Sequence, residues 1–168
     1  MSVERLFLLD PYNDTHFEMM KEFEARNGLE CTSTAMIDEI RKTIPKEEYA
    51  QNRKTKNEFN EMLIIVQNGK IKDSCAINGV KDRKSCRISF RPLKSRIKSR
   101  NLVSIATDYV LKTMNMQEAF TILPIENQNI MTMLEPQGYE NLGIEGNSII
   151  YLKENNLQSI TNKSNAMI

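Results

Sequence analysis

Two short apolar segments, CRISF at 86–90 and AFTIL at 119–123, read as buried strands on either side of one helical segment. The helix is predicted from about 102 to 115, because its apolar residues fall on one face: Leu102, Ile105, Tyr109, Val110 and Met114. A strand–helix–strand unit joins parallel strands through a right-handed crossover. The chain is therefore expected to contain a parallel strand pair.

A hairpin precedes this unit. The segments 62–67 (MLIIVQ) and 70–77 (KIKDSCAI) flank Asn68-Gly69, and Asn-Gly readily supplies the two positive φ angles of a type I′ turn. A second pair, Asn78-Gly79, is expected to open a basic connection to the strand at 86–90. Antiparallel strands should therefore lie beside the parallel pair.

The N-terminal third predicts one strand and two helices. Residues 3–9 read as a strand that ends at Asp10-Pro11. One helix is capped by Asp14 or Thr15 and stops at Asn27-Gly28. A second starts near Ser33 or Thr34 and ends at Pro45. Segment 46–61 is charged and weakly patterned, which fits either a loop or a short exposed helix.

The C-terminal third predicts a short helix and the closing strands. Asn127 or Asn129 caps the helix, Pro136 and Gly138 end it, and Tyr139 and 148–152 belong to strands. The predicted fold is α+β (mixed α/β), with a mixed, mostly antiparallel seven-stranded sheet and about four flanking helices. We expect a single domain over residues 1–154, followed by a polar tail at 155–168.

Composition narrows the class of protein. No apolar run approaches the roughly 20 residues of a membrane helix, and segment 1–13 has too short an apolar core for a signal peptide. The three widely spaced cysteines fit a reduced, cytoplasmic protein in which each is a small buried hydrophobe. With one histidine and no C-x-x-C pair, no metal site is expected.

Positive charge is concentrated in residues 81–100. This segment holds nine lysines and arginines and one acid, whereas the whole chain has 23 basic and 22 acidic residues. It ends where the predicted helix begins, and a helix start offers free backbone N–H groups to an anion. The pattern favours binding of a phosphorylated ligand, although a solvated basic surface or a nucleic-acid site would also use this charge.

The order of elements and a later motif resemble the GCN5-related N-acetyltransferase (GNAT) family across residues 1–153. The family motif N-x-x-A-x-x-x-Y-x-x-x-G-F is similar to residues 127–139. Asn127, Gly138 and Tyr139 match its Asn, Gly and aromatic positions. Ile130 takes the place of the Ala, and Leu134 takes the place of the Tyr.

The resemblance implies acetyl-CoA, or another acyl-CoA, as cofactor. The family's Q/R-x-x-G-x-G/A loop corresponds to residues 96–101, in which Ser99 and Asn101 replace the two small residues. Backbone N–H groups of this loop hold the diphosphate in the family. The cofactor-binding residues that the resemblance implies are Arg91, Leu93, Arg96, Ile97, Lys98, Ser99, Arg100, Asn101, Asn127 and Leu134.

The catalytic positions of the family are altered. The strand at 86–90 lacks the glutamate base that many members carry, and Leu134 cannot donate a proton as a tyrosine does. Glu126, at the end of a predicted strand, and Tyr139 are the candidate catalytic residues.

Two functions follow from the resemblance. The first is an acyl-CoA-dependent N-acyltransferase, in the simplest case an N-acetyltransferase, that acts on a small-molecule or protein amine. The second is a GNAT-like protein that binds acyl-CoA or a partner without efficient transfer. Nucleic acid ranks third because the remaining residues are net acidic. No membrane partner is expected, a homodimer is left open, and the acids in 14–60 make a cationic amine conceivable.

Overall fold

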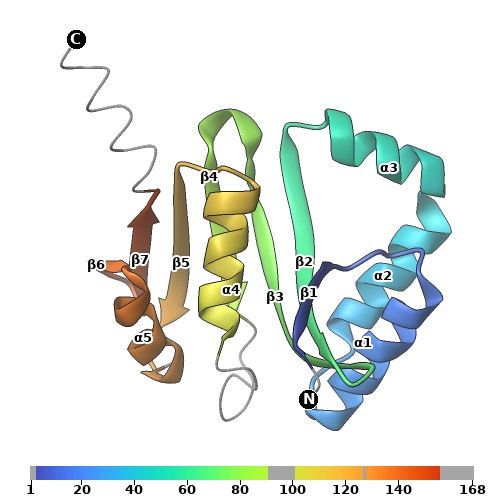
Figure 1. The fold of residues 1–168 in the computed structure, drawn as a ribbon, viewed down its shortest axis with the longest axis horizontal. Coiled ribbons are helices and arrows are strands. Elements are labelled where there is room, and N and C mark those ends of the chain that lie inside the picture. The colour runs from blue at the N-terminus through green and yellow to red at the C-terminus, as the bar shows by residue number, and fades with distance from the viewer. Residues whose placement is uncertain (1–2, 91–100, 127, 156–168) are drawn as a thin grey trace.

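The computed structural model describes residues 3–90, 101–126 and 128–155. Its seven strands form one sheet in the order β1-β2-β3-β4-β5-β7-β6, and Figure 1 shows them from right to left. The strands are β1 (Arg5–Leu8), β2 (Glu58–Gln67), β3 (Lys70–Val80), β4 (Ser85–Phe90), β5 (Glu118–Pro124), β6 (Glu140–Glu145) and β7 (Ser148–Glu154). β4 and β5 are parallel and all other neighbours are antiparallel, so the predicted mixed sheet is confirmed.

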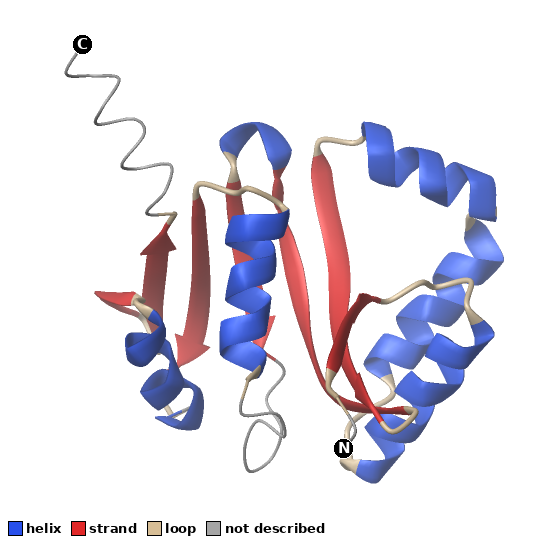
Figure 2. Cartoon of the chain, viewed as in Figure 1, coloured by secondary structure: helices blue, strands red, loops and turns tan. Residues whose placement is uncertain are grey.

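Five helices flank the sheet in the described residues, one more than expected (Figure 2). They are α1 (Asp14–Arg26), α2 (Thr32–Thr43), α3 (Lys46–Thr55), α4 (Leu102–Asp108) and α5 (Gln128–Leu134). A π-helical turn, Tyr109–Thr113, continues α4, and a 3-10 turn, Glu135–Gln137, continues α5. None of these helices combines the length and apolarity that a bilayer crossing requires.

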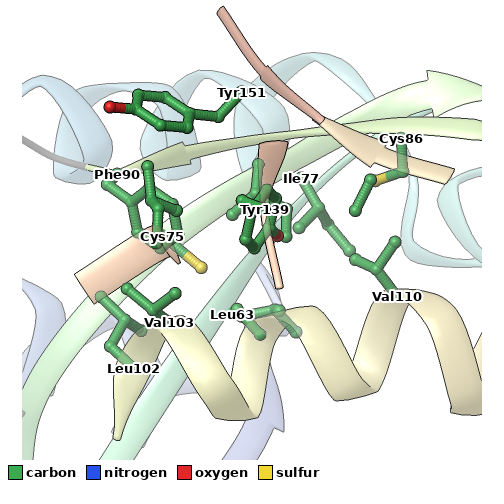
Figure 3. Close-up of a cluster of buried hydrophobic side chains, with 14 of the residues drawn as sticks. Leu63, Cys75, Ile77, Cys86, Phe90, Leu102, Val103, Val110, Tyr139 and Tyr151 are labelled. Carbon is green, nitrogen blue, oxygen red and sulfur yellow. The ribbon is translucent and has the colours of Figure 1, made fainter. Parts of the chain in front are cut away.

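The core lies on both faces of the sheet because neighbouring strand residues point to opposite sides. One cluster joins Leu63, Ile77 and Ile88 of the sheet to α4 and α5. Figure 3 shows Leu63 and Ile77 of this cluster beside α4. The other joins Ile64 and Ile71 to α1 and α2. The helices therefore cover β1 to β3 on one face and the centre of the sheet on the other.

The two Asn-Gly pairs behave differently. Asn68 and Gly69 have φ angles of 56° and 71°, and they form the predicted hairpin turn between β2 and β3. Asn78 and Gly79 lie inside β3, so the turn predicted there is wrong. A Cβ on Gly79 would stand 2.3 Å from the backbone oxygen of Ser85. This glycine therefore serves close strand packing.

The chain turns instead through the 3-10 helix Lys81–Arg83 and Lys84, whose φ is 49°. Segment 46–61 resolves into the exposed helix α3 and the first residues of β2, which begins earlier than predicted. The cap of α1 is Asn13, whose side chain accepts the His16 N–H, and not Asp14 or Thr15. Cys75 and Cys86 are buried as expected, but Cys31 is exposed.

Candidate functional site

The two parallel strands separate before they end. β4 and β5 pair at Ser85–Glu118, Cys86–Ala119 and Arg87–Phe120, and no pair follows among the described residues. Both strands continue for three or more residues, to Phe90 and Pro124. Their outer edges stay paired, β4 with β3 and β5 with β7. The sheet therefore has a gap that opens from Arg87 and Phe120 toward the carboxyl ends of the two strands.

This gap leaves polar backbone groups facing each other across it. Each extended strand presents alternate N–H and C=O groups along an edge, and such groups require partners when they are removed from water. A ligand with amide groups can fill the gap as a strand would. The gap is thus suited to a thin, extended ligand that carries amides.

Two buried polar side-chain atoms at the start of the gap have no partner in the described structure. These are Arg87 Nε and Thr121 Oγ1, and the only other such atom, Ser74 Oγ, belongs to β3. Arg87 is in the last β4–β5 pair, and Thr121 is the first β5 residue beyond it. Arg87 points to the same face as Phe120, and Thr121 points to the α4 face with Ala119. Buried polar groups are normally hydrogen-bonded, so an orphan on each face at the start of the gap is consistent with a ligand that enters it.

A cavity of about 800 Å³ adjoins the gap on the sheet face opposite α4. Arg87 and Phe120 line it, and they alternate along their strands with Cys86 and Ala119, which face the α4 core. Asn60 and Asn78 also line this cavity and a second one of about 330 Å³ next to α2. The two cavities share these residues and so form one groove from α2 to the gap.

Most of the predicted cofactor residues lie outside the described part of the chain: Arg91, Leu93, Arg96, Ile97, Lys98, Ser99, Arg100 and Asn127. Asn101 is exposed directly before α4, where its carbonyl accepts the Ile105 N–H at 2.8 Å. Leu134 is fully buried in the core beside α4. The cofactor role of these residues stays a prediction.

Tyr139 is a core residue. Its side chain is 4% exposed, and its hydroxyl lies 2.7 Å from the hydroxyl of Thr107 on α4. Burial raises the pKa of the Tyr139 phenol well above its ordinary value. Figure 3 shows its ring among apolar side chains of the sheet and α4. In this position Tyr139 fixes the sheet to α4, and a part in proton transfer remains only a prediction.

Glu126 is exposed beyond the end of β5. The backbone at Ile125 is fixed by a bond from its N–H to the Asn147 carbonyl, at 2.9 Å. Glu126 lies in the turn that follows β5, which continues from Phe120 to Pro124, and it is not among the residues that line either cavity of the groove. The structure therefore does not bring Glu126 next to Arg87 and Phe120, where the gap begins. Its role as a base stays a prediction.

The sequence interpretation missed Thr121, Asn60 and Asn78, and gave Arg87 no role beyond its charge. One signal was present, because Arg87 is the only charged residue of the strand segment CRISF. The others are recognised only from the strand register, which aligns Asn60, Asn78, Arg87 and Phe120 across four strands. No group of histidine, cysteine and acidic side chains suited to a metal occurs within the described ranges.

The sequence matches no protein-family model and no curated protein. Solved structures nevertheless share its architecture. The N-acetyltransferase PseH from Campylobacter jejuni, in complex with acetyl coenzyme A, aligns with a TM-score of 0.60 at 10% identity, over 90% of this chain and 99% of that one. The ribosomal-protein-S5-alanine acetyltransferase from Vibrio fischeri gives 0.67 at 12% identity, over 92% and 97%.

The spermidine/spermine N-acetyltransferase SpeG from Vibrio cholerae, in mutant forms, gives a TM-score of 0.60 at 14% identity, over 96% of this chain and 98% of that chain. Likeness at such identities establishes the fold and leaves the activity to be argued from the site. The chain has the fold of the GNAT superfamily, as the resemblance in its sequence predicted.

Proposed function

We propose that the protein is an acyl-CoA-dependent N-acyltransferase that uses acetyl-CoA to acetylate an amine. The observation that carries this proposal is the early end of β4–β5 pairing after Arg87 and Phe120. The pantetheine arm of coenzyme A is thin and contains two amides, which suits the two unpaired strand edges. PseH, which shares the fold, is solved with acetyl coenzyme A.

The residues present fit such a donor. The buried Thr121 hydroxyl has no partner in the described structure and lies at the start of the gap, on the α4 face. Under this proposal it donates a hydrogen bond to the thioester group. The segment that precedes α4 carries the basic residues predicted to hold the diphosphate, with Asn101 at the helix start. The described structure therefore supports the thioester end of the path, and the diphosphate end stays a prediction from the sequence.

When bound, acetyl-CoA supplies a thioester carbonyl carbon that forms a bond to the amine nitrogen while its C–S bond breaks. The protein must bring a neutral amine to this carbon and offer hydrogen-bond donors to the carbonyl oxygen. Unpaired backbone N–H groups of β4 and the Thr121 hydroxyl meet the second need. The amine loses one proton to water, and the thiolate, whose conjugate acid has a pKa of ~8.5, leaves as an anion.

A thiol-release assay with acetyl-CoA and a broad panel of amines tests this proposal. We expect acetyl-CoA-dependent thiol release with at least one amine, together with micromolar binding of acetyl-CoA by calorimetry. Thr121→Val should keep the fold, because it removes a hydroxyl that has no partner in the described structure, and should slow acetyl transfer. If calorimetry detects no binding of acetyl-CoA, the proposal is wrong.

A second function is favoured by one observation. Leu134 is buried where the family places a tyrosine, and β4 carries no carboxylate (its residues are SCRISF). A protein of this kind would bind acyl-CoA and act as a sensor or scaffold. Binding of acetyl-CoA without thiol release for any amine would select this second function.

A further inference from the structure

The cavity beside the gap has an unbalanced charge. Three cations line it, Lys56, Arg83 and Arg87, against one carboxylate, Glu58. None of the four takes part in an ion pair within the described ranges. By contrast, Arg53, on neighbouring α3, is neutralised by Glu61 at 2.8 Å. The side chains that line the cavity therefore carry more positive than negative charge, and none of its three cations is held in an ion pair with a described carboxylate.

Arg87 is the central cation of this cavity. It stands between Asn78 of β3 and Phe120 of β5 in the strand register, and its Nε is buried with no partner in the described structure. Arg87 is half-buried, and a buried N–H without an acceptor is costly. The planar fork of a guanidinium matches a carboxylate or phosphate. An anionic ligand would satisfy the donor that the described residues leave without a partner.

The rest of the lining suits a small organic anion. Asn60 and Asn78 add amide groups beside Arg87, and Phe120 and Ile122 add apolar surface on the side of the gap. The volume of about 800 Å³ falls within the range of small-molecule sites. A ligand held at Arg87 would have its other end at the start of the gap.

We infer that the acetyl acceptor is a small amine that also carries a carboxylate or phosphate, and that Arg87, assisted by Arg83 and Lys56, binds this anionic group. The inference rests on the proposed function, because it places the amine where the thioester would end. The same cations disfavour the ammonium form of a nearby amine, and so promote the neutral nucleophile. The cations of the cavity thus assist the deprotonation of the amine, for which β4 carries no carboxylate base.

The acids of α1 and α2 do not oppose this inference. Glu24 is buried and accepts the backbone N–H groups of Ser33 and Thr34, and Glu22 and Asp38 pair with neighbouring cations. None of these acids lines the groove. The acids that do line the groove are Glu58 and Glu61, and Glu61 is paired with Arg53, so the acids of α1 and α2 give a cationic amine no site there.

Matched amines test the inference. Each pair offers one amine with and without the anionic group: β-alanine against β-alaninamide, a dipeptide against its C-terminal amide, and phosphoethanolamine against ethanolamine. We expect the anionic member of at least one pair to have the higher kcat/KM, by about 10- to 100-fold, the range of a charged hydrogen bond. Arg87→Gln should remove this preference by raising KM, without weakening acetyl-CoA binding.

The control is Arg5→Gln, which removes an exposed cation on β1. It should change neither the preference for the anionic amine nor the affinity for acetyl-CoA. If Arg87→Gln does not fold, Arg83→Gln provides the same test, because Arg83 is exposed on a turn. Acetylation of neutral and anionic members at equal kcat/KM would overturn the inference and leave the proposed function standing. Failure to bind acetyl-CoA would overturn the proposed function itself.

A direct probe covers the case in which no amine of the panel reacts. Inorganic phosphate and acetate are titrated into the labelled protein while the Nε–H resonance of Arg87 is followed by NMR. A saturable shift of this resonance, with competition between the two anions, supports the inference. No shift at Arg87, or an equal shift at Arg5, contradicts it.

Discussion

The hydrogen bond between Tyr139 and Thr107 gives the sharpest test of how this fold is held together. Both side chains are buried, at 4% and 1% exposure, and their hydroxyls are 2.7 Å apart. Tyr139→Phe keeps the ring and removes one hydroxyl, so the Thr107 hydroxyl loses its partner inside the core. A buried donor left unsatisfied costs about 1–3 kcal/mol.

We expect Tyr139→Phe to lose about 2 kcal/mol of unfolding free energy, which lowers Tm by roughly 2–4 °C per kcal/mol in a chain of this size. A threonine in a helix can also bond to the carbonyl four residues earlier, which would bring the loss toward the lower end. Thr107→Val should cost a similar amount. The double variant should cost less than the sum, because it removes both partners together.

The assay is urea unfolding of four proteins: the parent, Tyr139→Phe, Thr107→Val and the double variant. Thiol release is measured for each per folded molecule. The structural role predicts lower stability and nearly unchanged turnover. The reasoning is refuted if Tyr139→Phe is as stable as the parent and loses acetyl transfer more than about 100-fold, an effect of the size expected for a general acid.

Three further predictions concern stability. Gly79→Ala should destabilise the sheet by about 3 kcal/mol, measured by urea unfolding, because its Cβ would approach the Ser85 oxygen to 2.3 Å; an unchanged midpoint would contradict this packing. Glu24→Gln should cost about 1–2 kcal/mol by weakening the bonds to the start of α2, whereas the exposed Glu22→Gln should cost under about 0.5 kcal/mol. His16, the only histidine, has its pKa lowered from 6.5 by burial, so the unfolded chain binds its proton first. Stability should therefore be complete above pH 6.5 and fall as the pH drops from 6.5 toward the folded pKa, and His16→Gln should flatten this change.

Local sequence signals predicted most of the fold. Asn68-Gly69 set a turn because its two residues accept positive φ angles, and the apolar segments at 86–90 and 119–123 became the parallel pair. Helix α3 has no clear sequence signal, because it buries no apolar face. Asn78-Gly79 wrongly predicted a turn, because a glycine is also required where two backbones approach closely inside a sheet.

The candidate site was less predictable. Arg87, Asn78 and Asn60 are 9 and 18 residues apart in sequence, and only the pairing of three strands aligns them. The end of pairing between β4 and β5 has no signal in either strand, because both segments read as ordinary buried strands. Local sequence patterns predict single helices and strands, whereas this candidate site depends on how the strands pair with one another.

The most direct test of the central claim is to follow backbone amide resonances while acetyl-CoA is titrated into the protein. The account predicts saturable shifts at micromolar concentrations that are largest in Ile88–Phe90 and Thr121–Leu123, the parts of β4 and β5 that do not pair with each other, with little change in β1. Shifts that do not saturate, or saturable shifts that spare both of these segments, would contradict it.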